Sequence, residues 1–540
     1  MNFENGSKSK KGLTRRQFLK GGTIAAVGLA AGGLMTGCES GSEKKKDSAS
    51  KNESGGWSWE TPPEPIPDSK IKETIESDIV IVGAGIAGVT AALRASEMGA
   101  KVTVIEKNDF PSSRGGHYGA WYTQAMKEAG VEPGDKYQIF RDWVKMCGNR
   151  CNEKIVWEYL DRSGEAFDWL INKSKGVLQF IPIDNRYRGP DYYEYPGTHI
   201  IAGEFEDNKN NLTPVVYYMW KKSEEQGVKY YFKTPAQQLV KDGGRVTAVI
   251  AKDKDGYKKF VGKKAVVLAT GDIGGDPEMV KAYAGDVGQL PKTNMYTPVG
   301  LNTGDGHKMG MWAGGHMEMG PLPTMIHLIK YAWYCFGFLY VNTEGKRFMN
   351  EDTWIQAKSI RILTQPGNVD YAFSIFDSKY LDELKDQIEI AGGQFWDDMV
   401  RIGPWKPDTT KKTVEDAIKS GNGFRADTLE ELADLIGVDK TNFINTVNKY
   451  NEMARAGEDT EFHKRKELLT TIEKPPFYAL KFGPAMLVIP GGLEISENYE
   501  VVDDNKKPIP GLYAIGNVAG GRYGVDYPVC INGNSHGSAL

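Results

Sequence analysis

Three glycines and one glutamate in the first part of the chain have the spacing of a dinucleotide-binding loop. Gly83, Gly85 and Gly88 form the pattern G-x-G-x-x-G, and Glu106 stands twenty-three residues after the first glycine. Glycines at these positions permit a tight turn, a close approach of backbone amides to a pyrophosphate, and close packing of the following helix. A carboxylate at Glu106 would accept hydrogen bonds from ribose hydroxyls and repel a 2′-phosphate, so the pattern favours NAD or FAD over NADP.

The residues around this loop predict the elements that must position it. An apolar, β-branched run ends at Val82, an alanine-rich helical pattern follows Gly85, and a second strand leads to Glu106. This order predicts a complete βαβ unit of the Rossmann type, with the helix N-terminus facing the phosphate charge. The dinucleotide contacts expected in this unit are Gly83, Ala84, Gly85, Ala87, Gly88, Glu106 and Lys107.

The composition of the 540-residue chain excludes several classes of protein. A formal net charge of -4 and a sequence pI near 6.1 leave no basic excess to bind a nucleic acid. The five cysteines are odd in number and scattered, unlike a disulfide framework, and there is no C-x-x-C-H motif for c-type haem. Cys147 and Cys151 stand four apart in a run predicted to be helical, where two separate thiols are favoured over a metal pair. We expect no metal site, and small molecules and proteins remain as partners.

Three later segments resemble parts of FAD-binding domains. Residues 114–117 (RGGH) follow the second strand, as in flavoproteins in which this loop passes the isoalloxazine. Residues 244–272 resemble the hairpin and Ala-Thr-Gly loop that close an FAD domain, and residues 511–521 resemble the late strand and turn that hold the ribityl chain. The resemblance implies FAD as the cofactor. It adds to the expected cofactor contacts Arg114, Gly115, Gly116, His117, Gln237, Thr270, Gly271, Asp305, Gly516, Asn517, Asn534 and Ser535.

Together these segments resemble the fumarate reductase and succinate dehydrogenase flavoprotein superfamily. Within it they resemble the single-chain branch with soluble fumarate reductases, urocanate reductase and ketosteroid dehydrogenases; residues 301–315 and 338–352 match its cap-side motifs. The resemblance implies an α/β fold, in which a Rossmann-like, glutathione-reductase-like FAD-binding domain is interrupted by an α+β capping domain. The expected boundaries are 1–38 for an export signal, 39–75 for a flexible linker, 76–282 and 474–540 for the two parts of the FAD-binding domain, and 283–473 for the capping domain.

The chain departs from the family where soluble fumarate reductases bind a dicarboxylate with one histidine and two arginines. A buried dianion needs that much fixed positive charge. Residues 487–492 read LVIPGG in place of HHTMGG, and the two arginine positions fall in RYGVDYPVCINGNS and in SKYLDEL, which offer no matching arginine. Fumarate is therefore not the expected substrate. The replacements are aromatic and neutral and indicate a larger, less charged one: Trp354, Tyr380, Tyr523 and Tyr527.

The family also supplies roles for a few residues of the predicted substrate site. Tyr527 and the proline after it resemble the closing loop of ketosteroid dehydrogenases, where a tyrosine hydroxyl and a backbone amide hold a substrate carbonyl. Glu351 matches the glutamate of the family's proton relay, and Tyr380 and Tyr527 are the candidates for the final proton donor. A packing role for Tyr527 stays open. The expected catalytic residues are Tyr527, Tyr523, Tyr380, Glu351 and Arg347.

His117 aligns with the histidine that carries covalent flavin in the multi-subunit succinate dehydrogenases. Single-chain relatives usually have another residue there and bind FAD without a bond. Two interpretations stay open, a covalent link at His117 and a histidine that only lines the flavin, and non-covalent binding is the expectation.

The first residues resemble a twin-arginine export signal. Arg15 and Arg16 precede a weakly apolar, glycine-rich stretch that is shorter than the ~20 residues a spanning helix needs. Residues 34–38 resemble a lipoprotein box that ends at Cys38. We expect export by the twin-arginine route to the periplasm, the cell surface or the outer face of the cytoplasmic membrane, where a lipid on Cys38 would anchor the protein.

These features predict an exported ene-reductase that saturates a C=C bond conjugated to a carbonyl in anaerobic respiration. The expected substrate is a steroid, bile acid, cardenolide or aromatic acrylate-like compound. Because the chain has no haem or iron-sulfur motif, its electrons would come from an external donor such as a cytochrome, a quinol-linked protein or another redox protein. Two alternatives stay open: a ketosteroid-type dehydrogenase that introduces the C=C bond, and a non-catalytic flavin-binding lipoprotein.

Overall fold

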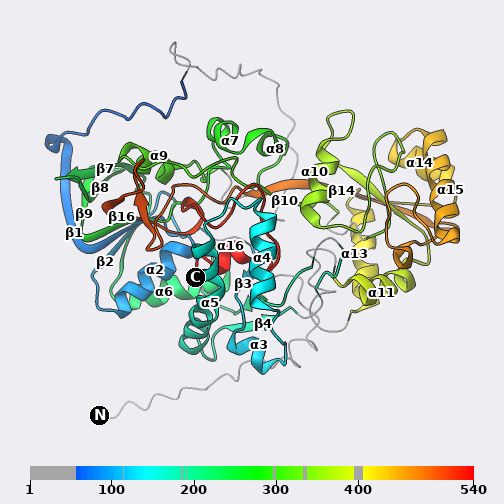
Figure 1. The fold of residues 1–540 in the computed structure, drawn as a ribbon, viewed down its shortest axis with the longest axis horizontal. Coiled ribbons are helices and arrows are strands. Elements are labelled where there is room, and N and C mark those ends of the chain that lie inside the picture. Colours follow the sequence, from blue (N-terminus) through cyan, green and yellow to red (C-terminus); the bar gives the residue numbers. More distant parts are fainter. Residues whose placement is uncertain are drawn as a thin grey trace.

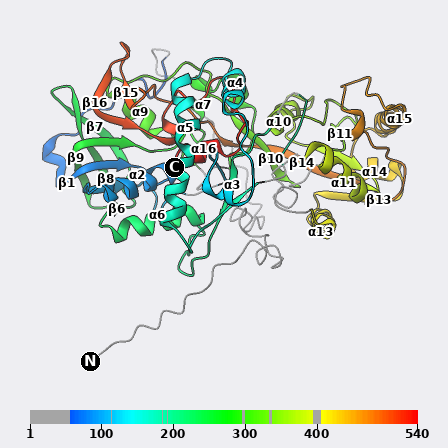
Figure 2. The ribbon, with the colours of Figure 1, turned by 60° about the horizontal axis from the view of Figure 1, so that its bottom comes forward.

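The computed structural model describes residues 56–112, 115–183, 186–190, 193–295, 300–332, 337–393 and 405–540. They form two lobes that can be distinguished in both views of the ribbon (Figures 1 and 2). The larger lobe holds the first elements of the chain and its last ones, and the smaller lobe, yellow-green to orange in Figure 1, is built from residues between them. The fold is thus an α/β domain interrupted by a capping domain. The predicted export signal lies outside the described residues.

The larger lobe is built on an eight-stranded sheet with the main order β15-β16-β9-β1-β2-β6, to which β7 and β8 add. Its parallel strands are β1 (Ile71–Val82), β2 (Val102–Ile105), β6 (Lys229–Tyr231), β9 (Gly256–Leu268) and β16 (Pro508–Ala514). The strands that pair antiparallel are β7 (Ala236–Asp242), β8 (Arg245–Asp253) and β15 (Glu500–Val502). Because parallel strands have their carboxyl ends at one edge, the segments that follow β1, β2, β9 and β16 meet there.

Apolar clusters cover both faces of this sheet. Alternate residues of β1 point to opposite faces, so Val80 belongs to one buried cluster and Ile81 to the other. The helices α2 (Ile86–Glu97) and α6 (Pro214–Glu225) pack on the Ile81 side. The helix α9 (Asp305–Trp312) contributes Met309 to the Val80 side. The predicted βαβ unit is present, with Gly85 as the N-cap of α2.

A three-stranded antiparallel sheet and several helices complete the larger lobe. The sheet has the order β3-β5-β4, with β3 (His117–Gly119), β4 (Gln179–Pro182) and β5 (Thr198–Ala202). The helices are α3 (Gln124–Glu128), α4 (Lys136–Met146), α5 (Glu153–Lys173), α7 (Pro277–Tyr283), α8 (Gly285–Gln289) and α16 (Asn534–Gly537), and the 3-10 turns are η1 (Asp68–Lys70) and η3 (Gly516–Val518).

The smaller lobe is the capping domain, or cap. It contains a five-stranded antiparallel sheet in the order β10-β14-β12-β11, with β13 also paired to β14. Its strands are β10 (Met325–Tyr331), β11 (Leu339–Val341), β12 (Ala372–Phe376), β13 (Gly423–Ala426) and β14 (Phe477–Val488). Its helices are α10 (Ile355–Leu363), α11 (Tyr380–Ala391), α13 (Pro407–Lys419), α14 (Leu429–Ile436) and α15 (Lys440–Ala456), with the 3-10 turn η2 (Lys466–Leu468). By its hydrogen bonds β14 belongs to this sheet, although the expected boundary at residue 473 assigned it to the FAD-binding domain. It leads the chain back to the larger lobe (Figure 1).

Two local expectations are corrected. The described part of the predicted linker is not all solvated, because Trp59 is buried with its ring 5.2 Å from that of Tyr283 and β1 already begins at Ile71. Cys147 and Cys151 do not share a helix: α4 ends before them and the chain turns through Gly148 and Asn149, both with positive φ.

Two classes of feature are absent from the described residues. They include no helix long and apolar enough to cross a bilayer. They also contain no group of histidine, cysteine, aspartate and glutamate side chains arranged to hold a metal ion.

Candidate active site

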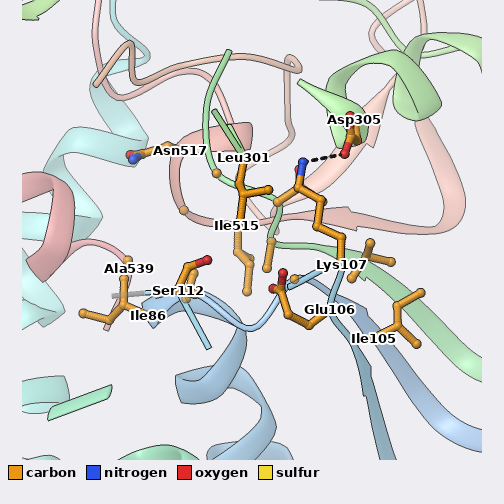
Figure 3. A pocket seen from close by; sticks show the side chains of 18 of the residues that line it. Ile86, Ile105, Glu106, Lys107, Ser112, Leu301, Asp305, Ile515, Asn517 and Ala539 are labelled. Carbon is orange, nitrogen blue, oxygen red and sulfur yellow. Dashed lines mark hydrogen bonds and ion pairs between the residues drawn. The ribbon is translucent and has the colours of Figure 1, made fainter. Parts of the chain in front are cut away.

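A cavity lies where the carboxyl ends of the parallel strands meet (Figure 3). Its walls come from the ends of β1 and β2, from the segment after β9, and from the segment after β16. This edge of an open α/β sheet is where nucleotides bind.

Many of the expected cofactor residues line this cavity. They are Gly83, Gly85, Ala87, Glu106, Lys107, Thr270, Gly271, Asp305, Gly516, Asn517 and Ser535. Other expected contacts are not among the lining residues: Ala84, Gly88, Gly115, Gly116, His117, Gln237 and Asn534. Arg114 lies outside the described residues. Sequence segments that are hundreds of residues apart thus converge on one site.

Each glycine of the loop is required for a different structural reason. A Cβ at Gly83, which has φ +105°, would lie 2.4 Å from the carbonyl oxygen of Ala269 on the neighbouring segment. A Cβ at Gly88 would lie 2.0 Å from the carbonyl oxygen of Gly83, so the helix could not pack this close to β1. A Cβ at Gly85 would meet no described atom within 4 Å. The first and third glycines therefore serve backbone packing, and the second leaves room for a ligand.

Glu106 holds the glycine loop from the end of β2. Its Oε2 accepts a hydrogen bond of 2.7 Å from the amide of Ala84, and its Oε1 accepts one of 2.9 Å from the amide of Asn108. Burial raises the pKa of Glu106, and these amides oppose that rise. Next to it, Lys107 Nζ lies 2.8 Å from Asp305 Oδ2, a pair that crosses the cavity rim (Figure 3).

Thr270 provides a test of whether the cavity fits a polar cofactor. Its hydroxyl is buried at the cavity wall and has no hydrogen-bond partner among the described residues. A buried polar atom without a partner costs about 1–3 kcal/mol, which a ligand atom in the cavity would relieve. Together with the glycine loop and the N-terminus of α2, this donor set fits a flavin dinucleotide.

Tyr523 and Tyr527 lie together in the loop that follows the cavity, which we call the closing loop (residues 522–533). Both are buried, and their ring centroids are 5.4 Å apart. Tyr523 donates a hydrogen bond of 2.9 Å to Asn534 Oδ1, and the amide of Ser535 donates one of 3.0 Å to the hydroxyl oxygen of Tyr527. Since Ser535 lines the cavity, Tyr527 is one hydrogen bond away from the cofactor site.

The structure places Tyr380 elsewhere. It lies at the start of α11 in an apolar cluster of the cap, with its ring 5.1 Å from Phe376 and 5.6 Å from Tyr478. Tyr523 and Tyr527 belong to a different cluster. Burial raises the pKa of Tyr380 to about 12. Its surroundings are those of a packing residue of the cap.

Glu351 and Arg347 form a closed ionic network inside the cap. Arg347 binds both oxygens of Glu351, each at 2.8 Å, and both oxygens of Asp459 at 2.9 and 2.8 Å. Lys464 Nζ lies 3.5 Å from Glu351 Oε2. Burial alone would raise the pKa of Glu351, but the charges of Lys464 and Arg347 outweigh it and lower that pKa. Glu351 is therefore ionised and holds no proton to donate.

Glu318 is a supporting residue that sequence reasoning did not find, and it lies outside the lining of the cofactor cavity. Its two carboxylate oxygens accept hydrogen bonds from the amides of Gly492, at 2.9 Å, and Gly521, at 2.7 Å. It thereby joins the segment after β14 to the turn that leads into the closing loop. Burial raises the pKa of Glu318 to about 7. Its partners are 174 and 203 residues away in sequence, so no local pattern marks it.

The fold and cavity define an α/β dinucleotide-binding enzyme with a capping domain. A family model described as "FAD binding domain" matches residues 78–533 of the chain. The chain belongs to this family, and its cofactor is FAD.

The similar proteins include reductases and dehydrogenases. The chain is 28% identical over 470 residues to a probable fumarate reductase of Shewanella frigidimarina (strain NCIMB 400), which covers 83% of this chain and 71% of that protein. It is 26% identical over 499 residues to the vinyl phenol reductase of Lactiplantibacillus plantarum, covering 86% and 94%. The solved open conformation of a flavocytochrome c3 fumarate reductase superposes with a TM-score of 0.64 at 26% identity, covering 87% of this chain and 78% of that one.

The chain spans only 45% and 48% of the length of two other curated relatives. Across these similarities the common chemistry is the oxidation or reduction of carbon–carbon bonds. The chain is an FAD-dependent oxidoreductase that acts on CH–CH groups.

Replacing Glu318 by glutamine should loosen the hold on FAD. The side chain keeps its size, but one acceptor oxygen becomes an NH₂ group that cannot accept from a backbone amide, and a lost hydrogen bond costs about 1–2 kcal/mol. We expect the Kd for FAD, measured by flavin fluorescence on stripped protein, to rise about tenfold. Glu497→Gln, on a side chain that is 56% exposed, is the control.

The same variant tests the pKa of Glu318. Because the folded-state pKa is raised from the ordinary 4.5 to about 7, this carboxyl contributes stability at low pH that is lost as the pH rises through 7. Glu318→Gln should remove that part of the pH dependence of the unfolding free energy. If Glu318→Gln and the wild type bind FAD equally well and their unfolding free energies depend on pH in the same way, the role of Glu318 is contradicted.

Proposed function

We propose that the protein is an exported ene-reductase that uses reduced FAD to saturate a C=C bond conjugated to a carbonyl. Its substrate would be largely neutral: a steroid, bile acid, cardenolide or aromatic acrylate-like compound. The observation that carries this proposal is the apolar cluster around the closing loop. It contains Trp143, Tyr159, Val488, Tyr523 and Tyr527, with Trp354 and Leu487 packed against it.

Two buried arginines differ in how far the chain itself engages them. Arg347 is neutralised by Glu351 and Asp459. Arg522 Nη2 donates to the carbonyl oxygen of Gly516 at 2.5 Å, while its Nε and Nη1 are buried without a hydrogen-bond partner among the described residues. A dicarboxylate would need uncommitted cations to replace its lost hydration. Around the closing loop the described residues offer one incompletely paired arginine beside a largely aromatic cluster, which favours a neutral substrate over the dianion fumarate. Similarity to a vinyl phenol reductase along most of that protein supports the same class.

When bound, reduced FAD supplies a hydride to the β carbon of the conjugated alkene. Tyr527 would orient the substrate by donating its hydroxyl proton to the carbonyl oxygen. This hydroxyl already accepts a hydrogen bond from the Ser535 amide, and an O–H group that accepts a hydrogen bond becomes a stronger donor. The negative charge that develops on the carbonyl oxygen would thus be stabilised. The aromatic cluster excludes water from this point.

The electron donor and the location belong to the same proposal. An external redox protein, such as a cytochrome or a quinol-linked donor, would reduce the flavin. The twin arginines Arg15 and Arg16 would direct export, and a lipid on Cys38 would tether the protein to the membrane; these residues lie outside the described ones. The second candidate, a ketosteroid-type dehydrogenase, is favoured by the resemblance of the Tyr527-Pro528 loop and uses the same site in the opposite direction.

A screen of electron acceptors tests the proposal. Protein reduced by a viologen should be reoxidised rapidly by enones and aromatic acrylates and at least ~100-fold more slowly by fumarate, since removing one charge-stabilising donor alone costs that much. Reduction of a dye by saturated ketones would instead identify the dehydrogenase. If neither the conjugated alkenes nor the saturated ketones react, the proposed reductase and dehydrogenase activities are both refuted, and only the flavin-binding carrier remains.

Replacing Tyr527 by phenylalanine tests the role of its hydroxyl. We expect turnover of the enone to fall about 100-fold, as for loss of one oxyanion donor, while the FAD content stays normal. Tyr137→Phe, at a residue that is 64% exposed, should leave turnover unchanged. Unchanged turnover in Tyr527→Phe would show that this residue only packs.

We propose that FAD is held without a covalent bond. His117 is buried in β3 and is not among the residues that line the cofactor cavity. Precipitation of the purified protein with acid should therefore release all the yellow colour into the supernatant. Flavin that stays in the pellet, and is lost from it in His117→Ala, would establish the bond instead.

A further inference from the structure

The proposed reduction needs a proton on the α carbon, and the residues expected at the substrate site are committed to other contacts or roles. Tyr523 donates its hydroxyl proton to Asn534, and Glu351 is ionised between Arg347 and Lys464. Of the two expected proton donors, Tyr380 lies in the interior of the cap, and Tyr527 is proposed to hold the substrate carbonyl. The donor has therefore to be sought among other groups near the closing loop.

Asp526 stands directly before Tyr527 in that loop and connects it to the cap. Its Oδ1 accepts a hydrogen bond of 2.8 Å from the amide of Tyr527 and one of 2.5 Å from Nε2 of Gln356, in helix α10 of the cap. The orientation of the Gln356 amide is fixed, because its Oε1 accepts a hydrogen bond of 3.1 Å from the amide of Ile326. Its NH₂ group must then face Asp526.

A chain of contacts leads from the cofactor cavity to this carboxyl. Ser535 lines the cavity, and its backbone amide donates a hydrogen bond to the hydroxyl oxygen of Tyr527. Asp526 is the residue directly before Tyr527 in the chain. Asp526 in turn meets Gln356 of the cap. The carboxyl thus lies at the junction of the two lobes, beside the residue proposed to hold the substrate carbonyl.

The two oxygens of Asp526 differ. Both hydrogen bonds that the described residues make to its side chain end on Oδ1, so Oδ2 is the oxygen that can carry a proton. Burial raises the pKa of Asp526 to about 6, opposed by the hydrogen bonds from the Tyr527 amide and Gln356. A general acid is most effective when its pKa lies near the working pH. A carboxyl with an ordinary pKa would be almost fully ionised there.

We propose that Asp526 is the proton donor of the reductase reaction, protonating the α carbon of the substrate from Oδ2. The hydride from reduced FAD forms the C–H bond at the β carbon, the proton from Asp526 forms the one at the α carbon, and the π bond is lost. The carboxylate that remains is stabilised on Oδ1 by Gln356 and the Tyr527 amide, and water returns its proton. This assignment rests on the proposed function.

The test uses Asp526→Asn in the full-length, FAD-loaded protein with an enone that reoxidises the reduced wild type. The rate of reoxidation by the enone should fall at least ~100-fold, the lower end of the contribution of a general acid. Reoxidation by ferricyanide, which needs no protonation of carbon, should be unchanged, as should the FAD content. Asp504→Asn, at a side chain that is 90% exposed, is the matched control.

The pH profile separates proton donation from a structural link between the lobes. Because the acid form of Asp526 is required, the rate at which the enone reoxidises the wild-type protein should fall as the pH rises through about 6. This falling limb of the pH profile should be absent in Asp526→Asn. Gln356→Met removes a hydrogen bond that lowers the pKa of Asp526, so the limb should move to higher pH.

Each outcome decides between the proposals. A reoxidation rate in Asp526→Asn within about threefold of wild type, or an unshifted limb in Gln356→Met, would overturn the role of Asp526 and leave the ene-reductase standing. If Asp526→Asn loses FAD, the position of the falling limb in the pH profile of Gln356→Met alone decides whether Asp526 is the proton donor. A wild type that no alkene reoxidises would overturn both proposals.

Discussion

The contact between the glycine loop and the neighbouring strand ends sets the geometry on which the site depends. Gly83 lies against the carbonyl of Ala269, and Gly88 lies against the carbonyl of Gly83, at distances that admit no side chain. This contact brings the N-terminus of α2 to the edge where the parallel strands end. Glu106 fixes the loop from the next strand through the amide of Ala84.

The other side of the site is held by hydrogen bonds between segments that are distant in sequence. Glu318 binds the amides of Gly492 and Gly521, and Asn534 accepts the hydroxyl of Tyr523. The closing loop is thus positioned by the larger lobe, and it meets the cap through Asp526 and Gln356. A substrate placed there would contact a wall that is largely aromatic, with one carboxyl at its edge.

The sequence predicted the cofactor half of this site well, because a βαβ unit is local. Strand, glycine loop, helix and acid lie within about 30 residues, and their spacing reflects contacts that each residue makes with near neighbours. The family resemblance extended this correctly to FAD and to a capping domain.

The substrate half was harder to predict, because alignment places a residue along the chain but does not say what its side chain contacts. Tyr380 stands in the predicted stretch yet packs in the cap, and Glu351 binds Arg347, four residues before it. Glu318 binds a segment 174 residues away, and Asp526 meets the cap through Gln356, 170 residues away, so no local pattern marks these links.

The most direct measurement of the central claim is a single-turnover reaction of reduced, FAD-loaded protein with one neutral enone or aromatic acrylate under anaerobic conditions. The account predicts that flavin is oxidised and that one equivalent of the saturated carbonyl compound appears for each flavin, with fumarate far slower. Oxidation of the flavin by fumarate faster than by every neutral alkene, or flavin oxidation without saturated product, would contradict it.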